Sequence, residues 1–454
     1  MNANCMRVKT RVIVATMTAA PERPATSAAH TGPTADGRRT NSSSSSTSPT
    51  PTGAHGSPYP TRHREAENRS RRIGRALKHI AGVDQLDETL MDRLGRGYFD
   101  KDEPGAAIAR AMRKRSGEPG AVSRRQLDEG LRSGTAGLPD DAPAALRDYL
   151  ALLEATPDWV DWDKIERGQK AYLKFGQNAA DILLQLSLIG GYRFGGPTDL
   201  LVATGGLTGN TTLRRLGETS HWTMSLSIPD GLRPGGEAWR LTAHVRAMHA
   251  VVNDAMEPRW DIDRWGLPIN QTDLASTLGL FDAVVLLGVR TLGVPVSRED
   301  SAAVMHVWRY VGWLMGVDDD LLVDSERQRH RINYHILQAQ AGMTEAGPKL
   351  THALIDAHRQ RHRSGPFPQV QAWFGHQRLL SMLTVLLGRE SMKEFGLPVR
   401  PPWAHAYLIA LNALRYRTPI GRARLESWGV KVRARQRKET FGDAKADIGR
   451  PRTD

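Results

Sequence analysis

The helical character of this chain is clearest from Asp163 to Ile189, a stretch that reads DKIERGQKAYLKFGQNAADILLQLSLI. Its apolar residues recur with the 3.6-residue period of a helix, and Gly190 and Gly191 follow as a stop signal. The same period dominates the rest of the chain, where the alternation typical of strands is nearly absent. The sequence therefore predicts an all-α protein.

Composition divides the 454 residues into four parts. Residues 1–70 are rich in Ser, Thr and Pro and bury too little apolar surface to offset the entropy of ordering, so we expect a disordered tail. Short helices are predicted in residues 71–143. Residues 144–421 form the main helical domain, and residues 422–454 form a basic tail that we expect to be mobile. Longer helices are predicted at 144–155, 163–189, 211–227, 236–255, 270–292, 298–315, 318–341, 348–363, 370–389 and 402–416.

The net charge of the chain is concentrated at its two ends. There are 62 Lys and Arg residues against 49 Asp and Glu, a formal charge of +13. Residues 1–75 carry +8 and residues 422–454 carry +5, so the body between them is neutral. A neutral body offers no general field for a polyanion. We therefore expect no nucleic-acid partner, which argues against the alternative of a helical interaction module with basic, anion-binding tails.

Cysteine content and hydropathy exclude further classes of protein. Cys5 is the single cysteine, so an intrachain disulfide, a cysteine-ligated zinc or iron–sulfur site and a thiolate-ligated haem are not expected. No membrane span is expected, because the best candidate, residues 277–296, is interrupted by Asp282 and Arg290. We expect a cytoplasmic protein, and the short apolar run at residues 12–20 is the one feature that would suit secretion.

Two predicted helices carry residues suited to chemistry. In residues 211–227, Arg215, Glu218, Thr219 and Trp222 have the spacing i, i+3, i+4 and i+7, so they share one helix face. That stripe suits a catalytic or binding site, and it equally suits an Arg–Glu ion pair on the surface. A di-iron site is not expected, because the Glu-x-x-His pattern occurs once, at residues 218–221.

The second helix, residues 236–255, carries His249. Val245 lies one turn before this histidine and Val252 lies about one turn after it. An imidazole in such an apolar setting suits a metal or haem ligand, and it also suits an ordinary core histidine.

Two other motifs have structural interpretations. Asn270 is expected to cap a helix, with Asp273 at the third helical position. Gly312 and Gly316 are expected to let neighbouring helices approach closely.

Four motifs in order carry a family resemblance. They are Arg-Leu-Gly-Glu-Thr at 215–219, Val-Arg-Ala-Met-His-Ala at 245–250, Trp-Gly-Leu-Pro-Ile-Asn-Gln-Thr-Asp at 265–273 and Trp-Arg-Tyr-Val-Gly-Trp-Leu-Met-Gly-Val at 308–317. With these motifs the chain resembles the latex-clearing rubber oxygenases and MpaB-type oxygenases over roughly residues 163–387. The resemblance implies a globin-like helical core that holds one haem b, so that residues 144–421 would be a haem-binding oxygenase domain.

The resemblance also implies roles for single residues. His249 would be the proximal iron ligand, and Arg215 and Thr219 would lie on the distal side, where Thr219 would give a hydrogen bond. Arg215 would contact a haem propionate or the distal oxygen, Arg246 would position the group or contact a propionate, and Asp199 would be a further pocket acid. The implied reaction is cleavage of a carbon–carbon double bond in an isoprenoid, or a similar hydrophobic chain, by dioxygen.

Glu218 departs from the pattern, because the latex-clearing type has a lysine there that caps the iron. The carboxylate could be a weak sixth ligand, a proton relay or the ion-pair partner of Arg215. The departure puts rubber itself in doubt as substrate and leaves open a haem-binding sensor or carrier without oxygenase activity. We expect a monomer or a weak oligomer.

Overall fold

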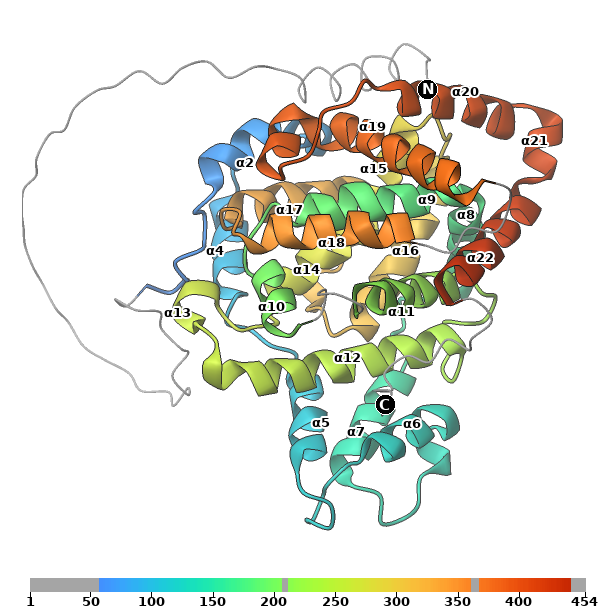
Figure 1. Ribbon diagram of the computed structural model, residues 1–454. Coiled ribbons are helices and arrows are strands. Elements are labelled where there is room, and N and C mark those ends of the chain that lie inside the picture. Colours follow the sequence, from blue (N-terminus) through green and yellow to red (C-terminus); the bar gives the residue numbers. More distant parts are fainter. Residues whose placement is uncertain (1–56, 206–210, 361–366, 442–454) are drawn as a thin grey trace, which may run out of the picture.

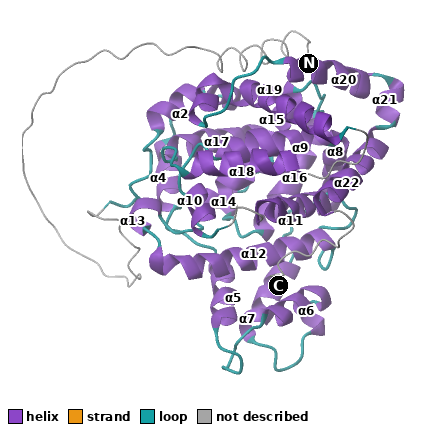
Figure 2. Ribbon diagram, in the orientation of Figure 1, coloured by secondary structure: helices purple, strands orange, loops and turns teal. Residues whose placement is uncertain are grey.

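The computed structural model describes residues 57–205, 211–360 and 367–441, except the side chains of residues 211–216, 360 and 439–441. Figure 1 shows these residues as a layered bundle of helices, and Figure 2 shows helices joined by loops. Every regular element that the structure describes is a helix, so the predicted all-α class is confirmed.

Between residues 57 and 143 the structure describes five helices and one 3-10 turn. They are α2 (Glu67–Ile73), α3 (Arg75–Ala81), α4 (Glu88–Arg96), α5 (Glu103–Arg113), α6 (Arg124–Ser133) and η1 (Thr135–Gly137). The main domain follows with α7 (Ala144–Glu154), α8 (Trp162–Phe175), α9 (Gln177–Ile182), the π-helix η2 (Leu183–Ile189), α10 (Pro197–Ala203), α11 (Thr211–Ser225), α12 (Glu237–Met256), η3 (Glu257–Arg259) and α13 (Ile262–Trp265). It continues with α14 (Gln271–Phe281), α15 (Ala283–Thr291), α16 (Arg298–Leu314), η4 (Asp319–Leu321), α17 (Glu326–Ala339), α18 (Ala346–Gln360), α19 (Pro368–Glu394), α20 (Trp403–Arg417), α21 (Pro419–Ala423) and α22 (Leu425–Phe441).

The helices pack in a recognisable order around the centre of the molecule. Figure 1 shows α12 along one edge, with α5, α6 and α7 beneath it and α17 and α18 crossing the middle of the view. Helices α19 and α20 cover the opposite edge. Helix α8 packs closely on α16 because Gly168 has no side chain: a Cβ there would lie 2.4 Å from the carbonyl oxygen of Ala303.

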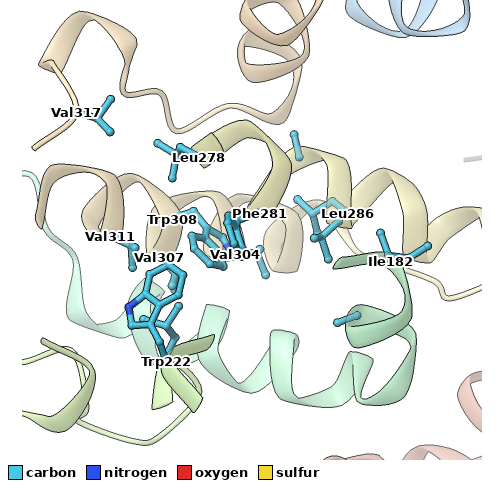
Figure 3. Packing of buried hydrophobic residues seen from close by; sticks show 14 of the residues in the cluster. Ile182, Trp222, Leu278, Phe281, Leu286, Val304, Val307, Trp308, Val311 and Val317 are labelled. Atoms are coloured by element: carbon cyan, nitrogen blue, oxygen red, sulfur yellow. The ribbon is translucent and has the colours of Figure 1, made fainter. Parts of the chain in front are cut away.

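Three aromatic rings from different helices meet in the core. Trp222 of α11 contacts Phe281 of α14 edge to face, with ring centroids 5.5 Å apart, and Phe281 stacks on Trp308 of α16 at 5.2 Å. Figure 3 shows the three side chains gathered between these helices. Such contacts add about 0.5–1.5 kcal/mol each to the free energy gained by burial. The cluster therefore anchors α11 to the centre of the bundle.

The stretch that predicts the fold class most clearly is not one continuous helix. The expected helix at 163–189 is broken at Gly176, whose φ of 49° and ψ of −127° suit glycine and few other residues. The last seven residues form the π-helix η2. Periodicity alone did not reveal either change, because both leave the apolar pattern nearly intact.

The expected helix at 270–292 is divided at Asp282, which lies between α14 and α15 with φ −96° and ψ −94°. Its carboxylate accepts the backbone N–H of Ala283 and pairs with Arg329 of α17 at 2.8 Å, and both side chains are almost fully buried. Residues 271–291 have a mean hydropathy of 1.6, enough to cross a membrane by length and composition. Most of this stretch, 61%, is buried inside the protein, as in the core helix of a bundle.

Both ends of the described chain differ from expectation. The predicted disordered tail reached residue 70, but the ordered structure includes residues from 57 onward, and Arg62 is fully buried in an ion pair with Asp273 at 2.5 Å. The predicted mobile tail from residue 422 begins instead with α22, which packs on α8 and α11. One large side chain helps to hold each segment on the bundle. At the N-terminal end this is Arg62. At the C-terminal end it is Trp428 of α22, which lies against Gly176 and under the Arg415 guanidinium.

Other expectations agree with the structure or need small changes. Asn270 caps α14 by accepting the Asp273 backbone N–H at 2.9 Å, as predicted. A Cβ at Gly312 would lie 2.6 Å from Leu278, which confirms the expected close approach. The helix predicted at 318–341 is replaced by a short 3-10 turn, η4, and a later start for α17 at Glu326.

The Asp282–Arg329 pair generates a stability prediction. Arg329→Met leaves Asp282 buried with no cation, so we expect the free energy of unfolding at pH 7 to fall by about 3–5 kcal/mol. Burial already raises the pKa of Asp282, so this loss should shrink as the pH is lowered toward protonation of the carboxyl. Urea denaturation measures both effects. The double variant Asp282→Leu/Arg329→Met should recover most of the loss, and a single variant as stable as the parent would contradict the prediction.

Candidate functional site

Helices α11 and α12 run antiparallel, side by side (Figure 1). Near their connection, Trp222 Nε1 donates to Thr242 Oγ1 at 2.9 Å, and His221 Nε2 lies 3.4 Å from Glu237 Oε1. These two contacts fix how α11 packs on α12 near the connection between the helices.

His249 lies seven residues after Thr242, on the stripe of α12 that faces α11. Its side chain is half-buried, as are Val245 and Val252 one turn away on either side. On the α5 side of α12, His249 also lines a small pocket of about 20 Å³ with Lys101 and Asn253. The apolar setting predicted for this imidazole is thus present on one side, and a polar pocket lies on the other.

Arg246 lies one turn before His249 and is 5% exposed. Its Nε and Nη2 donate to the two carboxylate oxygens of Asp102, at 2.7 and 2.6 Å. This bidentate pair holds α12 against the start of α5. Sequence reasoning missed Asp102, and its one local signal is its position two residues before Pro104, where a helix is expected to begin.

The residues expected on the distal side come from α11. Glu218 is half-buried one turn before Trp222, and Thr219 is exposed. Arg215 lies on α11, but its side chain lies outside the described residues. The structure thus brings the helix of Arg215 and Glu218 against the helix of His249.

Asp199 has a local structural function and is not joined to His249 by any described contact. It is the third residue of α10, and its Oδ2 accepts hydrogen bonds from the Gly196 backbone at 2.9 Å, from Thr198 at 3.2 Å and from Thr344 at 3.1 Å. These bonds fix the start of α10 and tie it to the loop before α18.

A second cavity, which the sequence did not indicate, lies on the other side of α14. Its volume is about 560 Å³, within the usual range for small-molecule pockets. Its walls come mainly from α3, η2, α14, α15, α17 and α20 and are largely apolar. The two cavities have no lining residue in common. Helix α14 borders both, with Leu274 on the first and Ser276 and Leu280 on the second.

His405 of α20 is the histidine that lines this second cavity, with 7% of its surface exposed. Neither ring nitrogen has a hydrogen-bond partner among the described residues. Burial, with a smaller contribution from Arg378, lowers the pKa of His405 to about 4. The imidazole is therefore neutral at pH 7.

Comparison with known proteins now identifies the family. Residues 174–418, more than half of the chain, match the model of the family described as "ER-bound oxygenase mpaB/B'/Rubber oxygenase, catalytic domain". The chain belongs to this family. The predicted resemblance is therefore confirmed, and both His249 and His405 lie within the matched catalytic domain.

Two relatives define how far the family likeness extends. A rubber oxygenase from Streptomyces sp. (strain K30) is 24% identical over 228 residues, which are 48% of this chain and 54% of that protein. The match thus spans about half of the relative's length. The solved structure of latex clearing protein in the closed state superposes with a TM-score of 0.59 and 20% identity, covering 74% of this chain and 91% of the other. At that identity the likeness shows the fold alone.

Among the described residues, no group of three or more His, Cys, Asp or Glu side chains is arranged to hold a metal ion. A metal bound mainly by protein side chains is therefore not indicated in that part of the chain. A metalloporphyrin differs from such a site, because it needs only one axial side-chain ligand.

The α5–α12 interface offers a matched pair of variants. Asp102→Ala leaves the Arg246 guanidinium buried without a carboxylate, so we expect the free energy of unfolding to fall by about 3–5 kcal/mol. Asp254→Ala breaks the exposed pair between Asp254 and Arg113 across the same two helices, where the cost should stay below about 1 kcal/mol. Chemical denaturation of the two variants and the parent gives the comparison. Equal losses would show that burial of Arg246 is unimportant.

The buried imidazole in the larger cavity predicts a pH dependence. Because the folded-state pKa of His405 is about 4 and an unfolded histidine titrates near 6.5, the unfolded state binds more protons between these values. Stability is therefore retained above pH 6.5 and lost as the pH falls toward 4, by up to about 3 kcal/mol from this group. The free energy of unfolding, measured by denaturation at several pH values in that range, should change less with pH for His405→Phe than for the parent. An equal pH dependence in both proteins would refute the lowered pKa of His405.

Proposed function

We propose that this protein is a haem b-dependent oxygenase that cleaves carbon–carbon double bonds in an isoprenoid or similar unsaturated apolar chain. The observation that carries the proposal is the position of His249. It lies on α12, which packs on the helix that bears Arg215 and Glu218, inside the domain matched by the oxygenase family.

The donor set around His249 suits haem. Imidazole is a common axial ligand of haem iron, and Val245 and Val252 supply apolar surface beside it. The pocket of about 20 Å³ on the α5 side is too small for a porphyrin. Haem would instead be held by His249 together with residues of α11.

Haem iron, when bound, supplies the binding and activation of dioxygen. The chain supplies position and polarity. Arg246, held by Asp102, orients α12 and so the His249 ring, which makes Arg246 a positioning residue in this proposal. On α11, the Glu218 carboxyl would hold or release a proton, the Thr219 hydroxyl would donate a hydrogen bond, and Arg215 would pair with a propionate. Asp199 would act by fixing the start of α10 rather than by contact with the substrate.

The substrate class follows from the family. The family description names rubber oxygenase, and a rubber oxygenase is among the relatives of this chain. Rubber is an apolar unsaturated chain, and we propose a substrate of that class. Because Glu218 replaces the lysine expected in the latex-clearing type, we propose a smaller isoprenoid than rubber as substrate.

Haem binding by His249 is tested with two histidines of one helix. His249→Ala should lose the Soret band of the purified, haemin-loaded protein, because the axial ligand is removed. His244→Ala should keep it, since His244 points to α6 and lies 3.1 Å from Asp128. Absorbance spectra at equal protein concentration decide the matter. A parent protein that takes up no haemin would end the proposal.

Oxygenase chemistry is distinguished from a haem sensor or carrier by products. The loaded parent should consume oxygen and form aldehydes or ketones from squalene or polyisoprene, and Glu218→Gln should slow this reaction while retaining the Soret band. The carrier alternative predicts a stable haem spectrum without oxygen uptake on any unsaturated chain.

A further inference from the structure

The larger cavity has walls from α14 and α15. They include Ser276, Leu280, Val284, Leu287 and Thr291, on both sides of the break between the two helices at Asp282. The π-helix η2 forms another wall, and π-helices are frequent at functional sites. A largely apolar space of about 560 Å³ is large enough for a long hydrocarbon chain.

One charged side chain lines this space. Arg193 follows η2, and its Nε donates to the Gly190 carbonyl at 2.8 Å, which leaves both Nη groups without a described partner. Among the described residues, no carboxylate lies within 4.0 Å of its guanidinium. The nearby acid, Glu394, is already paired with Arg69 by two hydrogen bonds. Burial, and next the charge of Arg69, lower the pKa of Arg193 to about 10, so it stays positive at pH 7.

A second polar group lies in another part of the wall. His405 lines the cavity, is more than nine-tenths buried, and has no described partner for either ring nitrogen. It lies near Arg378 of α19, whereas Gly190 lies beside Leu387, one residue before the break in α19 at Gly388. Arg193 and His405 are placed in the wall by different elements, the segment after η2 and helix α20. Buried polar groups without partners usually mark a ligand or a water molecule.

We propose that this cavity binds a long-chain carboxylic acid, with the carboxylate on Arg193 and the chain along α14 and α15. One guanidinium with two open donor groups matches one carboxylate in charge and geometry. A diphosphate would bring more negative charge than this wall can neutralise, because Arg69 is already paired. The neutral His405 gives a hydrogen bond to a second oxygen on the chain, where the ligand has one. The site does not depend on haem or on the proposed oxygenase reaction.

Binding of oleic acid to the full-length protein, below its micelle concentration, tests the proposal by equilibrium dialysis. The parent should bind one oleate per chain saturably, and Arg193→Gln should weaken this binding at least about tenfold, the effect of a lost charged hydrogen bond. Arg193→Lys should retain much of the affinity. Arg417→Gln is the matched control, since Arg417 is an exposed arginine of α20, and it should bind as the parent does.

Further probes separate the head group from the chain. Oleyl alcohol should bind the parent more weakly than oleate, and its affinity should not change in Arg193→Gln. Leu280→Trp should reduce binding of both probes by filling the cavity, with thermal unfolding and circular dichroism showing that the variant is folded. Arg193→Gln should be about as stable as the parent, because Arg193 is half-buried and has no ion pair among the described residues.

Three results would overturn the proposal. They are equal oleate affinity in the parent and Arg193→Gln, no saturable oleate binding by the parent, and binding of oleyl phosphate at least tenfold tighter than oleate. The His249→Ala variant separates the two sites, because it should lose the Soret band and keep its affinity for oleate. Loss of oleate binding in that variant would contradict the independence of the cavity.

Discussion

A buried ion pair between Asp282 and Arg329 fixes the junction of α14 and α15, the two helices that line the larger cavity. The pair sets the break between α14 and α15 and joins it to α17, with both side chains almost fully removed from solvent. Two charges in such a place are tolerated only while they remain together. Because Asp282 also accepts the first N–H of α15, the direction of that helix depends on the same carboxylate.

Helix α14 divides the chemistry of the protein into two regions. On one side, Leu274 borders the small polar pocket that reaches His249 and the Arg246–Asp102 pair. On the other, Ser276 and Leu280 border the large apolar cavity with Arg193 and His405. Phe281, near the end of the helix, lines that cavity and also packs against Trp222, so the wall of the cavity is mechanically connected to α11.

Much of the main domain was predictable from pattern. Helices α7, α11, α12, α16 and α20 begin and end within a few residues of their predicted bounds, because their apolar period and their Gly, Pro and cap residues agree. The errors have local causes. Gly176 interrupts a periodic stretch without altering its period, and Asp282 interrupts another through a contact with a residue distant in sequence. Arg62 and Trp428 lie in segments whose average composition predicts a tail. Each is nevertheless held in the folded protein by its own side-chain contacts, which average composition does not show.

The sequence by itself determined the helical class, the family and the candidate ligand His249, since periodicity and short motifs are local properties. Tertiary structure alone decided which residues lie together. It paired Arg246 with Asp102, gave Asp199 a structural task at the start of α10, and placed Arg193 and His405 on one apolar cavity although 212 positions separate them. The physical reason is that burial and charge pairing depend on neighbours in space. An arginine or histidine therefore becomes chemically unusual only when folding removes its water and leaves its polar atoms without partners.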